Sequence, residues 1–216
     1  QVVDVAHKAG VKRSLEAVPS IGLGTSLVNP LEIVSAFSTF GNGGIHVEPF
    51  GVLKVVDNQG KTLEEYIPEE QETFTPQASY ILVNMMKGVV QRGTGSHASR
   101  LKRPIAGKTG TSQDSKDMWF IGMTPDLAAG GWMGYDDMTS LPMKDWSSGL
   151  AVAWWTEIME SVLKDQPIRD FPVPEGVIFV TVDPETGKLA LPTCKKKMLD
   201  AFVKGIEPTV FCDANH

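Results

Sequence analysis

The sequence contains no concentration of positive charge. Its 20 lysine and arginine residues are spread along 216 positions and are outnumbered by 26 acidic residues, which gives a formal net charge of −6. Proteins that bind DNA or RNA usually gather basic side chains into a patch or stripe. The composition therefore predicts no nucleic-acid partner.

A hydrophobic run long enough to cross a membrane is also absent. The most apolar stretch, Leu150–Leu163, is interrupted by Glu157 and Glu160 and is shorter than the roughly 20 residues of a transmembrane helix. The sequence has neither an initiating methionine nor a signal segment, and residues 2–11 have the pattern of a helix already in progress. We therefore expect the chain to start inside a longer protein, with any membrane anchor upstream of residue 1.

Residues that bind metals are few and scattered. The two cysteines, Cys194 and Cys212, form no C-x-x-C pair, and the four histidines lie far apart in the sequence, so we predict no metal and no cofactor. A disulfide between the two cysteines would stabilise the fold by about 3 kcal/mol in an oxidising compartment. Two free, partly buried thiols would give the same pattern, and the sequence leaves the pairing open.

The residues that are present indicate one good-sized domain, or one domain with a small appendage. Asn29 and Pro30 occupy the N-cap and N1 positions of a predicted helix, which Gly41–Gly44 ends with residues that tolerate positive φ. The segment Ile45–Leu63 predicts a hairpin, because β-branched residues surround the turn residues Asp57–Gly60.

A second helix and three strands follow this hairpin. The helix begins at Thr75 and Pro76 and ends at Gly93, with apolar residues recurring at a four-residue spacing. Thr124–Asp126 predicts a turn between the last two strands, which should therefore be antiparallel neighbours. The predicted strands are Ile105–Ser112, Met118–Met123 and Leu127–Tyr135, and a final helix covers Gly149–Leu163.

The character of the sequence changes at Gln166. Three prolines within a few residues indicate an extended connector, and Val177–Val182 then alternates as a strand. We predict that residues 1–165 form the main body and residues 166–216 form a C-terminal connector, hairpin and tail.

The sharpest local motif is Gly107-Lys108-Thr109-Gly110-Thr111. A phosphate-binding P-loop has a similar sequence, but it requires a glycine five positions before the Gly-Lys pair and a helix after it. Lys102 occupies that position and strand-like residues follow. The motif therefore argues against nucleotide binding.

The other interpretation is the K-T-G box of active-site serine penicilloyl enzymes, which lies on an edge strand. Gly110 would let an extended peptide approach and add to the sheet edge by main-chain hydrogen bonds. Thr109 and Thr111 offer hydroxyls to a terminal carboxylate, Lys108 adds positive potential and can help to move protons, and the Thr111 N–H is a possible oxyanion donor. A surface strand with an exposed lysine and a glycine bulge would have the same letters.

Several further motifs occur in a fixed order along nearly the whole chain. They are Gly24-Thr25-Ser26, Asn29-Pro30-Leu31-Glu32, Phe40-Gly41-Asn42-Gly43-Gly44, Arg92-Gly93-Thr94-Gly95, Gly107 to Ser112, Asp117 to Gly122, Thr124-Pro125-Asp126 and Trp132 to Asp136. In this order they resemble the transpeptidase domain of class A penicillin-binding proteins, the bifunctional peptidoglycan synthases.

The resemblance implies an α/β (α+β) fold of the penicillin-binding and serine β-lactamase type, in which helices flank a five-stranded antiparallel sheet. The fold would be present here only in part, with residues 1–165 as the C-terminal portion of the transpeptidase domain. Lys108 and Thr111 would be catalytic, Thr109, Gly110 and Thr111 would bind substrate, and Trp119 and Trp132 would be core aromatics.

The resemblance also implies an activity and its partners. In that family a serine attacks the penultimate D-Ala carbonyl of a peptidoglycan stem peptide ending in D-Ala-D-Ala, and an amine from a neighbouring stem completes the cross-link. β-Lactam antibiotics acylate the same serine. A glycosyltransferase domain and a membrane anchor would lie in the upstream portion of the same protein, on the extracytoplasmic (periplasmic) face of the bacterial cytoplasmic membrane.

The nucleophile of that family is missing from the sequence. It belongs to a Ser-x-x-Lys box, which is expected with a Ser-x-Asn box before the lysine strand, and Ser-x-Asn does not occur here. Ser99–Lys102 lies too close to the strand in sequence, and Ser161–Lys164 follows it, so we interpret both as chance matches. We expect the chain alone to be inert, with both boxes upstream of residue 1.

Other functions remain open. A D,D-carboxypeptidase would pass the acyl group to water, and a sensor or binding module of the same fold would have lost catalysis. The extended C-terminal tail argues against a β-lactamase, which would be a compact free domain. The missing P-loop glycine argues against a nucleotide-binding protein, which titration with ATP would test.

Overall fold

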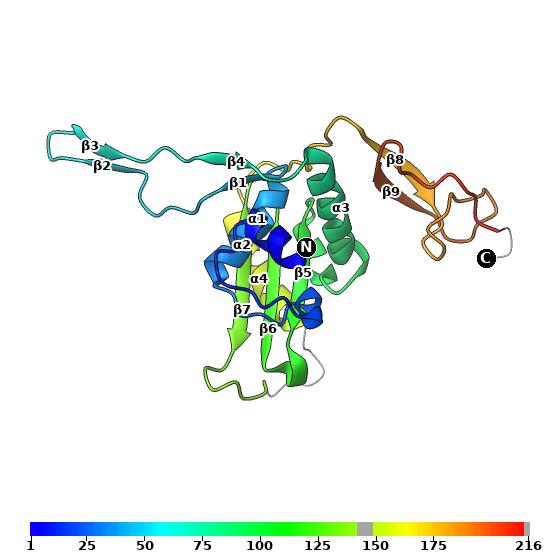
Figure 1. Cartoon of the computed structure of the whole chain (residues 1–216), viewed down its shortest axis with the longest axis horizontal. Coiled ribbons are helices and arrows are strands. Elements are labelled where there is room, and N and C mark those ends of the chain that lie inside the picture. The colour runs from blue at the N-terminus through cyan, green and yellow to red at the C-terminus, as the bar shows by residue number, and fades with distance from the viewer. Residues whose placement is uncertain (142–148, 214–216) are drawn as a thin grey trace.

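A three-stranded antiparallel sheet forms the centre of the molecule (Figure 1). The computed structural model describes residues 1–141 and 149–213. Within them, β5 (Ala106–Thr111), β6 (Asp117–Met123) and β7 (Ala128–Gly134) lie in the order β5-β6-β7. These strands agree closely with the three that the sequence predicts, and β6 and β7 are antiparallel neighbours as expected.

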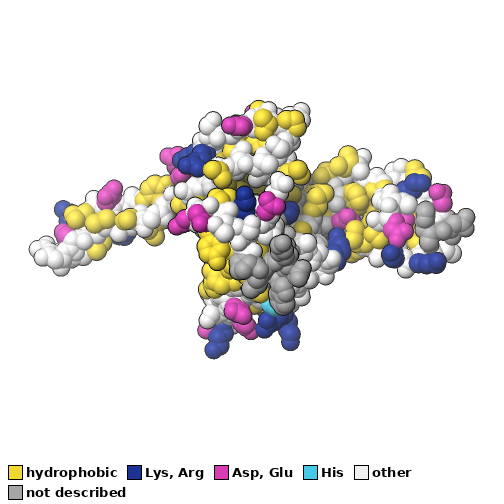
Figure 2. Space-filling view, turned by 90° about the horizontal axis from the view of Figure 1, so that it is seen from below, with side chains coloured by type: hydrophobic (Ala, Val, Ile, Leu, Met, Phe, Trp, Pro, Cys, Tyr) yellow, Lys and Arg dark blue, Asp and Glu magenta, His cyan; other side chains and the backbone are white. Residues whose placement is uncertain are grey.

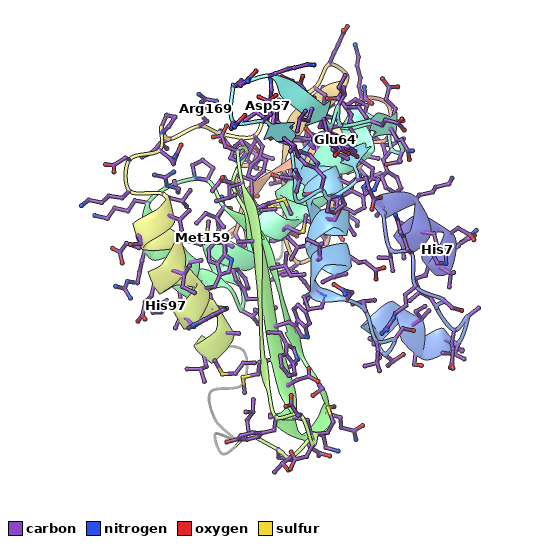
Figure 3. The ribbon with its side chains drawn as sticks, turned by 90° about the vertical axis from the view of Figure 1, so that its left-hand side faces the viewer. His7, Asp57, Glu64, His97, Met159 and Arg169 are labelled. Atoms are coloured by element: carbon purple, nitrogen blue, oxygen red, sulfur yellow. A yellow bond between two sulfur atoms is a disulfide. The ribbon has the colours of Figure 1, made fainter. Side chains whose placement is uncertain are left out.

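Helices cover both faces of this sheet. Figure 3 shows the sheet nearly edge-on, with α4 (Gly149–Val162) on one side and α2 (Pro30–Gly41) on the other. Successive side chains of a strand point to opposite faces. On the α4 face, Phe120 packs against Trp155, with ring centroids 5.0 Å apart. The predicted fold class, an antiparallel sheet flanked by helices, is confirmed, although the described residues supply three strands of the five that the resemblance implies.

Glycines allow α4 to approach the sheet closely. A Cβ atom added to Gly122 would lie 2.5 Å from the Trp155 ring, and one added to Gly131 would lie 2.1 Å from the Trp154 ring. The Trp155 indole also donates a hydrogen bond to the Ala129 carbonyl at 3.0 Å. The indole N–H is therefore satisfied inside the core, as a buried tryptophan requires.

The predicted helix starts are confirmed by their caps. The Asn29 side chain accepts a hydrogen bond from the Leu31 amide at 2.9 Å at the start of α2. Thr75 Oγ1 accepts one from the Ala78 amide at 3.3 Å at the start of α3 (Pro76–Arg92). Each cap satisfies a backbone donor that the first helical turn leaves free.

A β-hairpin arm, which we define as residues 45–72, projects from the body between α2 and α3 (Figure 1). Its tip is the predicted hairpin, in which β2 (Lys54–Val56) pairs antiparallel with β3 (Thr62–Glu65). The Asp57 carboxylate accepts hydrogen bonds from two amides of the turn, both at 2.9 Å. Figure 2 shows hydrophobic side chains along the arm, of which Val52, Leu53, Val56 and Leu63 are exposed.

The arm is longer than predicted. β1 (Ile45–Val47) pairs with β4 (Glu70–Glu72), so the excursion closes near Glu72 and not at Leu63. The turn is a local signal that the sequence reveals, whereas the pairing of β1 with β4 joins residues far apart in the sequence.

The C-terminal unit, which we define as residues 166–213, packs against α3. Its strands β8 (Val177–Val182) and β9 (Met198–Val203) are antiparallel, and a disulfide joins Cys194 to Cys212, which answers the question that the sequence left open. Phe179 meets the ring of Tyr80 on α3 edge-on at 6.3 Å.

The remaining described elements are short. They are α1 (Val2–Ala9) and three 3-10 helices, η1 (Pro19–Leu23), η2 (Ser96–Leu101) and η3 (Gln113–Ser115). None of the helices within residues 1–141 and 149–213 combines the length and the apolar character needed to cross a bilayer.

Candidate active site

The Gly107–Thr111 motif lies on β5, at the edge of the central sheet. β5 pairs with β6 along its whole length, from Ala106 opposite Met123 to Thr111 opposite Met118. Among the described strands, none pairs with the other side of β5. The motif is therefore a strand with one open edge, and it does not form the loop followed by a helix that a P-loop requires.

The motif residues divide between the two faces of the sheet. Lys108 and Gly110 share the face that α2 covers in part, because they pair with Ile121 and Trp119 of β6. Lys108 is exposed, and its ammonium group donates a hydrogen bond to the Thr109 carbonyl at 2.6 Å. The structure thus holds a positive charge beside the backbone of the open edge.

The two threonines of the motif lie on the opposite face of β5. Thr111 is exposed, whereas Thr109 is buried and retains 8% of its accessible surface. The Thr109 hydroxyl lies 2.7 Å from the hydroxyl of Thr94, in the loop that follows α3. Thr94 belongs to the Arg92-Gly93-Thr94-Gly95 motif, but nothing in the sequence shows that it meets Thr109, 15 positions away.

The glycines of β5 are required by its close contact with β6. A Cβ atom on Gly107 would lie 2.7 Å from the Phe120 ring and 2.9 Å from the Ile121 carbonyl oxygen. A Cβ atom on Gly110 would lie 3.2 Å from Trp119 Cβ, which is a milder conflict. A side chain at Gly107 would therefore disturb the core, and one at Gly110 would disturb the Lys108 face.

Two tryptophans lie on the same face as Lys108, which corrects a prediction. Trp119 and Trp132 are register partners on β6 and β7, but Trp119 is only partly buried and Trp132 is 41% exposed. They are not core aromatics, because α2 contacts this face near Gly130 and Met123 and does not cover Trp119 and Trp132.

Neither Ser-x-x-Lys sequence is built as a nucleophile box. Ser99 lies in η2, and its hydroxyl donates to the Ser96 carbonyl at 2.7 Å. Ser161 is near the end of α4, and both it and Lys164 are exposed. In neither case does the described structure place a lysine ammonium against the serine hydroxyl.

The site is an open edge and not an enclosed pocket. A shallow hollow of about 200 Å³ lies beside the Thr124–Leu127 turn and the end of α2. Of the β5 residues, Ala106 lies nearest to that turn, because it pairs with Met123 at the end of β6. Ligand pockets are usually concave, so this edge alone does not enclose a ligand.

Comparison with known sequences identifies the protein family of this chain. Residues 4–160 match the family described as "Penicillin binding protein transpeptidase domain". The chain therefore belongs to the penicillin-binding protein transpeptidase family. Residues 173–216 match "Penicillin-binding protein 1A, C-terminal domain", so within that family the chain corresponds to the C-terminal region of class A proteins.

Named relatives support this placement, and solved structures share the fold. The chain is 38% identical over 211 residues to penicillin-binding protein 1A of Aquifex aeolicus, covering 98% of this chain and 29% of that protein. The crystal structure of penicillin-binding protein 1A from Haemophilus influenzae superposes with a TM-score of 0.85 at 24% identity, over 98% of this chain and 38% of the other. PonA1 of Mycobacterium tuberculosis matches 80% of this chain and 52% of its own, with a TM-score of 0.69 and 25% identity. The chain spans about three tenths of the length of the curated relatives it matches.

Proposed function

We propose that this chain forms the strand-edge half of an acyl-serine D,D-transpeptidase that cross-links peptidoglycan. The observation that carries the proposal is the open edge of β5, which presents the Lys108–Thr111 backbone and side chains to a ligand. The serine comes from another part of a longer polypeptide that contains residues 1–216, which we call the parent protein. The boundary between its transpeptidase domain and its C-terminal unit is proposed near residue 165.

The substrate binds as an added strand. A stem peptide ending in D-Ala-D-Ala pairs with the open edge of β5 by main-chain hydrogen bonds, which Gly110 permits because no side chain projects there. The hydroxyls of Thr109 and Thr111 donate to the terminal carboxylate, and the Lys108 ammonium stabilises its charge. Binding therefore recognises both the extended backbone and the free C-terminus.

The reaction proceeds in two acyl transfers. The serine oxygen attacks the penultimate D-Ala carbonyl while its proton passes to a base of the site, and the Thr111 N–H stabilises the oxyanion. Collapse of this intermediate breaks the peptide bond and releases D-Ala, which takes up a proton. The amine of a neighbouring stem then attacks the acyl-serine ester, forming the new amide and regenerating the serine. β-Lactams acylate the same serine.

Two further findings support this assignment. The matched structure of PonA1 is a complex with penicillin V, which is the ligand class proposed here. The Cys194–Cys212 disulfide fits an oxidising compartment and thus an extracytoplasmic location on the bacterial membrane.

Covalent labelling tests the proposal. The parent protein should react with a fluorescent penicillin, whereas the polypeptide 1–216 alone should remain unlabelled because it lacks the serine. Lys108→Met in the parent protein should slow labelling by about 100-fold, because it removes the charge that assists proton transfer and carboxylate binding. Lys164→Met, which alters an exposed lysine at the end of α4, is the matched control and should label normally.

Labelling and a stem-peptide assay together separate the alternatives. A parent protein that is never labelled, or a Lys108→Met variant that labels at the normal rate, would contradict the assignment. If the acyl group of a stem-peptide substrate passes only to water and never to an added amine, the parent protein is a D,D-carboxypeptidase.

A further inference from the structure

The loop after α3 places a second hydroxyl against the proposed substrate-binding threonine. Thr94 Oγ1 and Thr109 Oγ1 are 2.7 Å apart, which is the usual length of an O–H···O hydrogen bond. Thr94 is exposed and Thr109 is 8% exposed. The pair therefore spans the boundary between solvent and the interior beside β5.

The backbone holds Thr94 in this position. The amides of Gly93 and Gly95, on either side of Thr94, both donate to the Val89 carbonyl, at 3.1 and 3.0 Å. A Cβ atom on Gly93 would lie 3.0 Å from that carbonyl oxygen, and one on Gly95 would lie 3.3 Å from the Phe120 ring. The loop is thus anchored to the last turn of α3 on both sides of Thr94, and to the core at Gly95.

The direction of the hydrogen bond decides what Thr109 can offer to a ligand. A hydroxyl has one proton to donate and two lone pairs that accept, whereas an ionised carboxylate only accepts. If Thr109 donates to Thr94, it turns its lone pairs toward the carboxylate and repels it. If Thr94 donates to Thr109, the Thr109 proton is free to point to the open edge.

We propose that Thr94 is a positioning residue that donates its hydroxyl proton to Thr109 Oγ1 and thereby directs the Thr109 proton toward the carboxylate of the bound peptide or β-lactam. This inference rests on the proposed function and assigns a role to Thr94, which no sequence motif had suggested. It predicts that Thr94 matters for ligands that carry the carboxylate and not for neutral ones.

The test compares two ligands of the parent protein, benzylpenicillin and its neutral methyl ester. In Thr94→Val, the second-order rate of acylation by benzylpenicillin should fall by about tenfold, as expected for one hydrogen bond to a charged group. The rate with the methyl ester should stay unchanged, so the preference for the carboxylate shrinks by the same factor. Thr94→Ser keeps the hydroxyl and should restore the preference.

Ser96→Ala is the matched control, because it removes an exposed hydroxyl from the same loop and should leave both rates unchanged. In a Thr109→Val background, Thr94→Val should add no further loss, because the hydroxyl that it orients is gone. If Thr94→Val fails to fold, Thr94→Ala carries the same expectations.

Three results would overturn the inference. They are an unchanged rate with benzylpenicillin, an equal loss for both ligands, and an additive loss in the double variant. They are distinct from failure of the proposed function, in which the unaltered parent protein shows no acylation by either ligand and both proposals fall.

Discussion

At the scale of single residues, the two glycines of β5 have different roles that the sequence motif does not distinguish. Gly107 faces the core and lies against Phe120 and the Ile121 carbonyl, whereas Gly110 lies against Trp119 on the partly open face. The motif alone suggested a role only for Gly110, because peptide binding explains a glycine at an edge.

We predict that Gly107→Ala destabilises the protein more than Gly110→Ala. The methyl group at residue 107 must displace backbone or a buried ring, which costs about 1–3 kcal/mol. At residue 110 the neighbouring Trp119 is only partly buried and can shift by a few tenths of an ångström. The free energies of unfolding of both variants, from urea denaturation, check the order, and equal losses would contradict it.

The same pair separates stability from ligand binding. Gly110→Ala should slow acylation by a penicillin more strongly than its small loss of stability explains, because the methyl group lies on the Lys108 face of the open edge. A Gly110→Ala variant with the acylation rate of the unaltered protein would show that ligands do not approach this face of β5.

At the scale of elements, α3 joins three parts of the molecule. Its first turn is capped by Thr75, its middle packs against Ala106 of β5 and Phe171 of the connector, and its last turn anchors the loop that carries Thr94. A loss of helical structure in α3 would therefore disturb the core and the site together.

Removal of the cap should weaken α3 at its start. Thr75→Ala leaves the Ala78 amide without its side-chain acceptor and should lower the free energy of unfolding by about 1 kcal/mol. Thr75→Ser keeps an acceptor oxygen and should be nearly neutral. Hydrogen exchange at the Ala78 amide reports the effect locally, and normal protection in Thr75→Ala would show that the cap contributes nothing.

Elements with local signals could be predicted from the sequence. Caps at Asn29 and Thr75, the Asp57 turn and the Thr124–Asp126 turn are properties of neighbouring residues, so they predicted the two helices, the hairpin tip and the antiparallel pairing of β6 with β7. The pairing of β1 with β4 and the contact of Thr94 with Thr109 depend on residues brought together by folding. The exposure of Trp132 depends on how far α2 covers the sheet, which no local pattern reveals.

At the scale of the whole molecule, the C-terminal unit is joined to the body through α3. Asn84 of α3 donates a hydrogen bond to the Asp200 carboxylate of β9 at 2.7 Å, and Tyr80 lies edge-on to Phe179 of β8. Figure 1 shows the unit extending outward from this helix, away from the central sheet. A small interface therefore determines how firmly the unit is held.

This interface should weaken at high pH. Burial raises the pKa of Tyr80, and the charge of Asp170 adds to the effect. Because the folded pKa lies above the unfolded value of about 10, the contribution of the neutral ring is fully present below about pH 10 and is lost as the pH rises through the folded pKa. Tyr80→Phe should remove this loss, because Phe keeps the ring and cannot ionise.

Calorimetric unfolding between pH 8 and 11 measures the effect. The unaltered protein should lose more stability over this range than Tyr80→Phe, and Tyr135→Phe, which alters a tyrosine that is 48% exposed, should behave like the unaltered protein. Identical pH profiles for all three would show that Tyr80 stays neutral or ionises without cost.

The open edge of β5 also has a consequence for solubility. An unpaired strand can join any other extended chain, including β5 of a neighbouring molecule, and this is how many sheets begin to aggregate. Lys108 opposes such stacking, because each additional copy brings another ammonium charge to the same short ribbon and the charges repel. The side chain proposed to attract a peptide carboxylate would then also keep identical molecules from assembling through that edge.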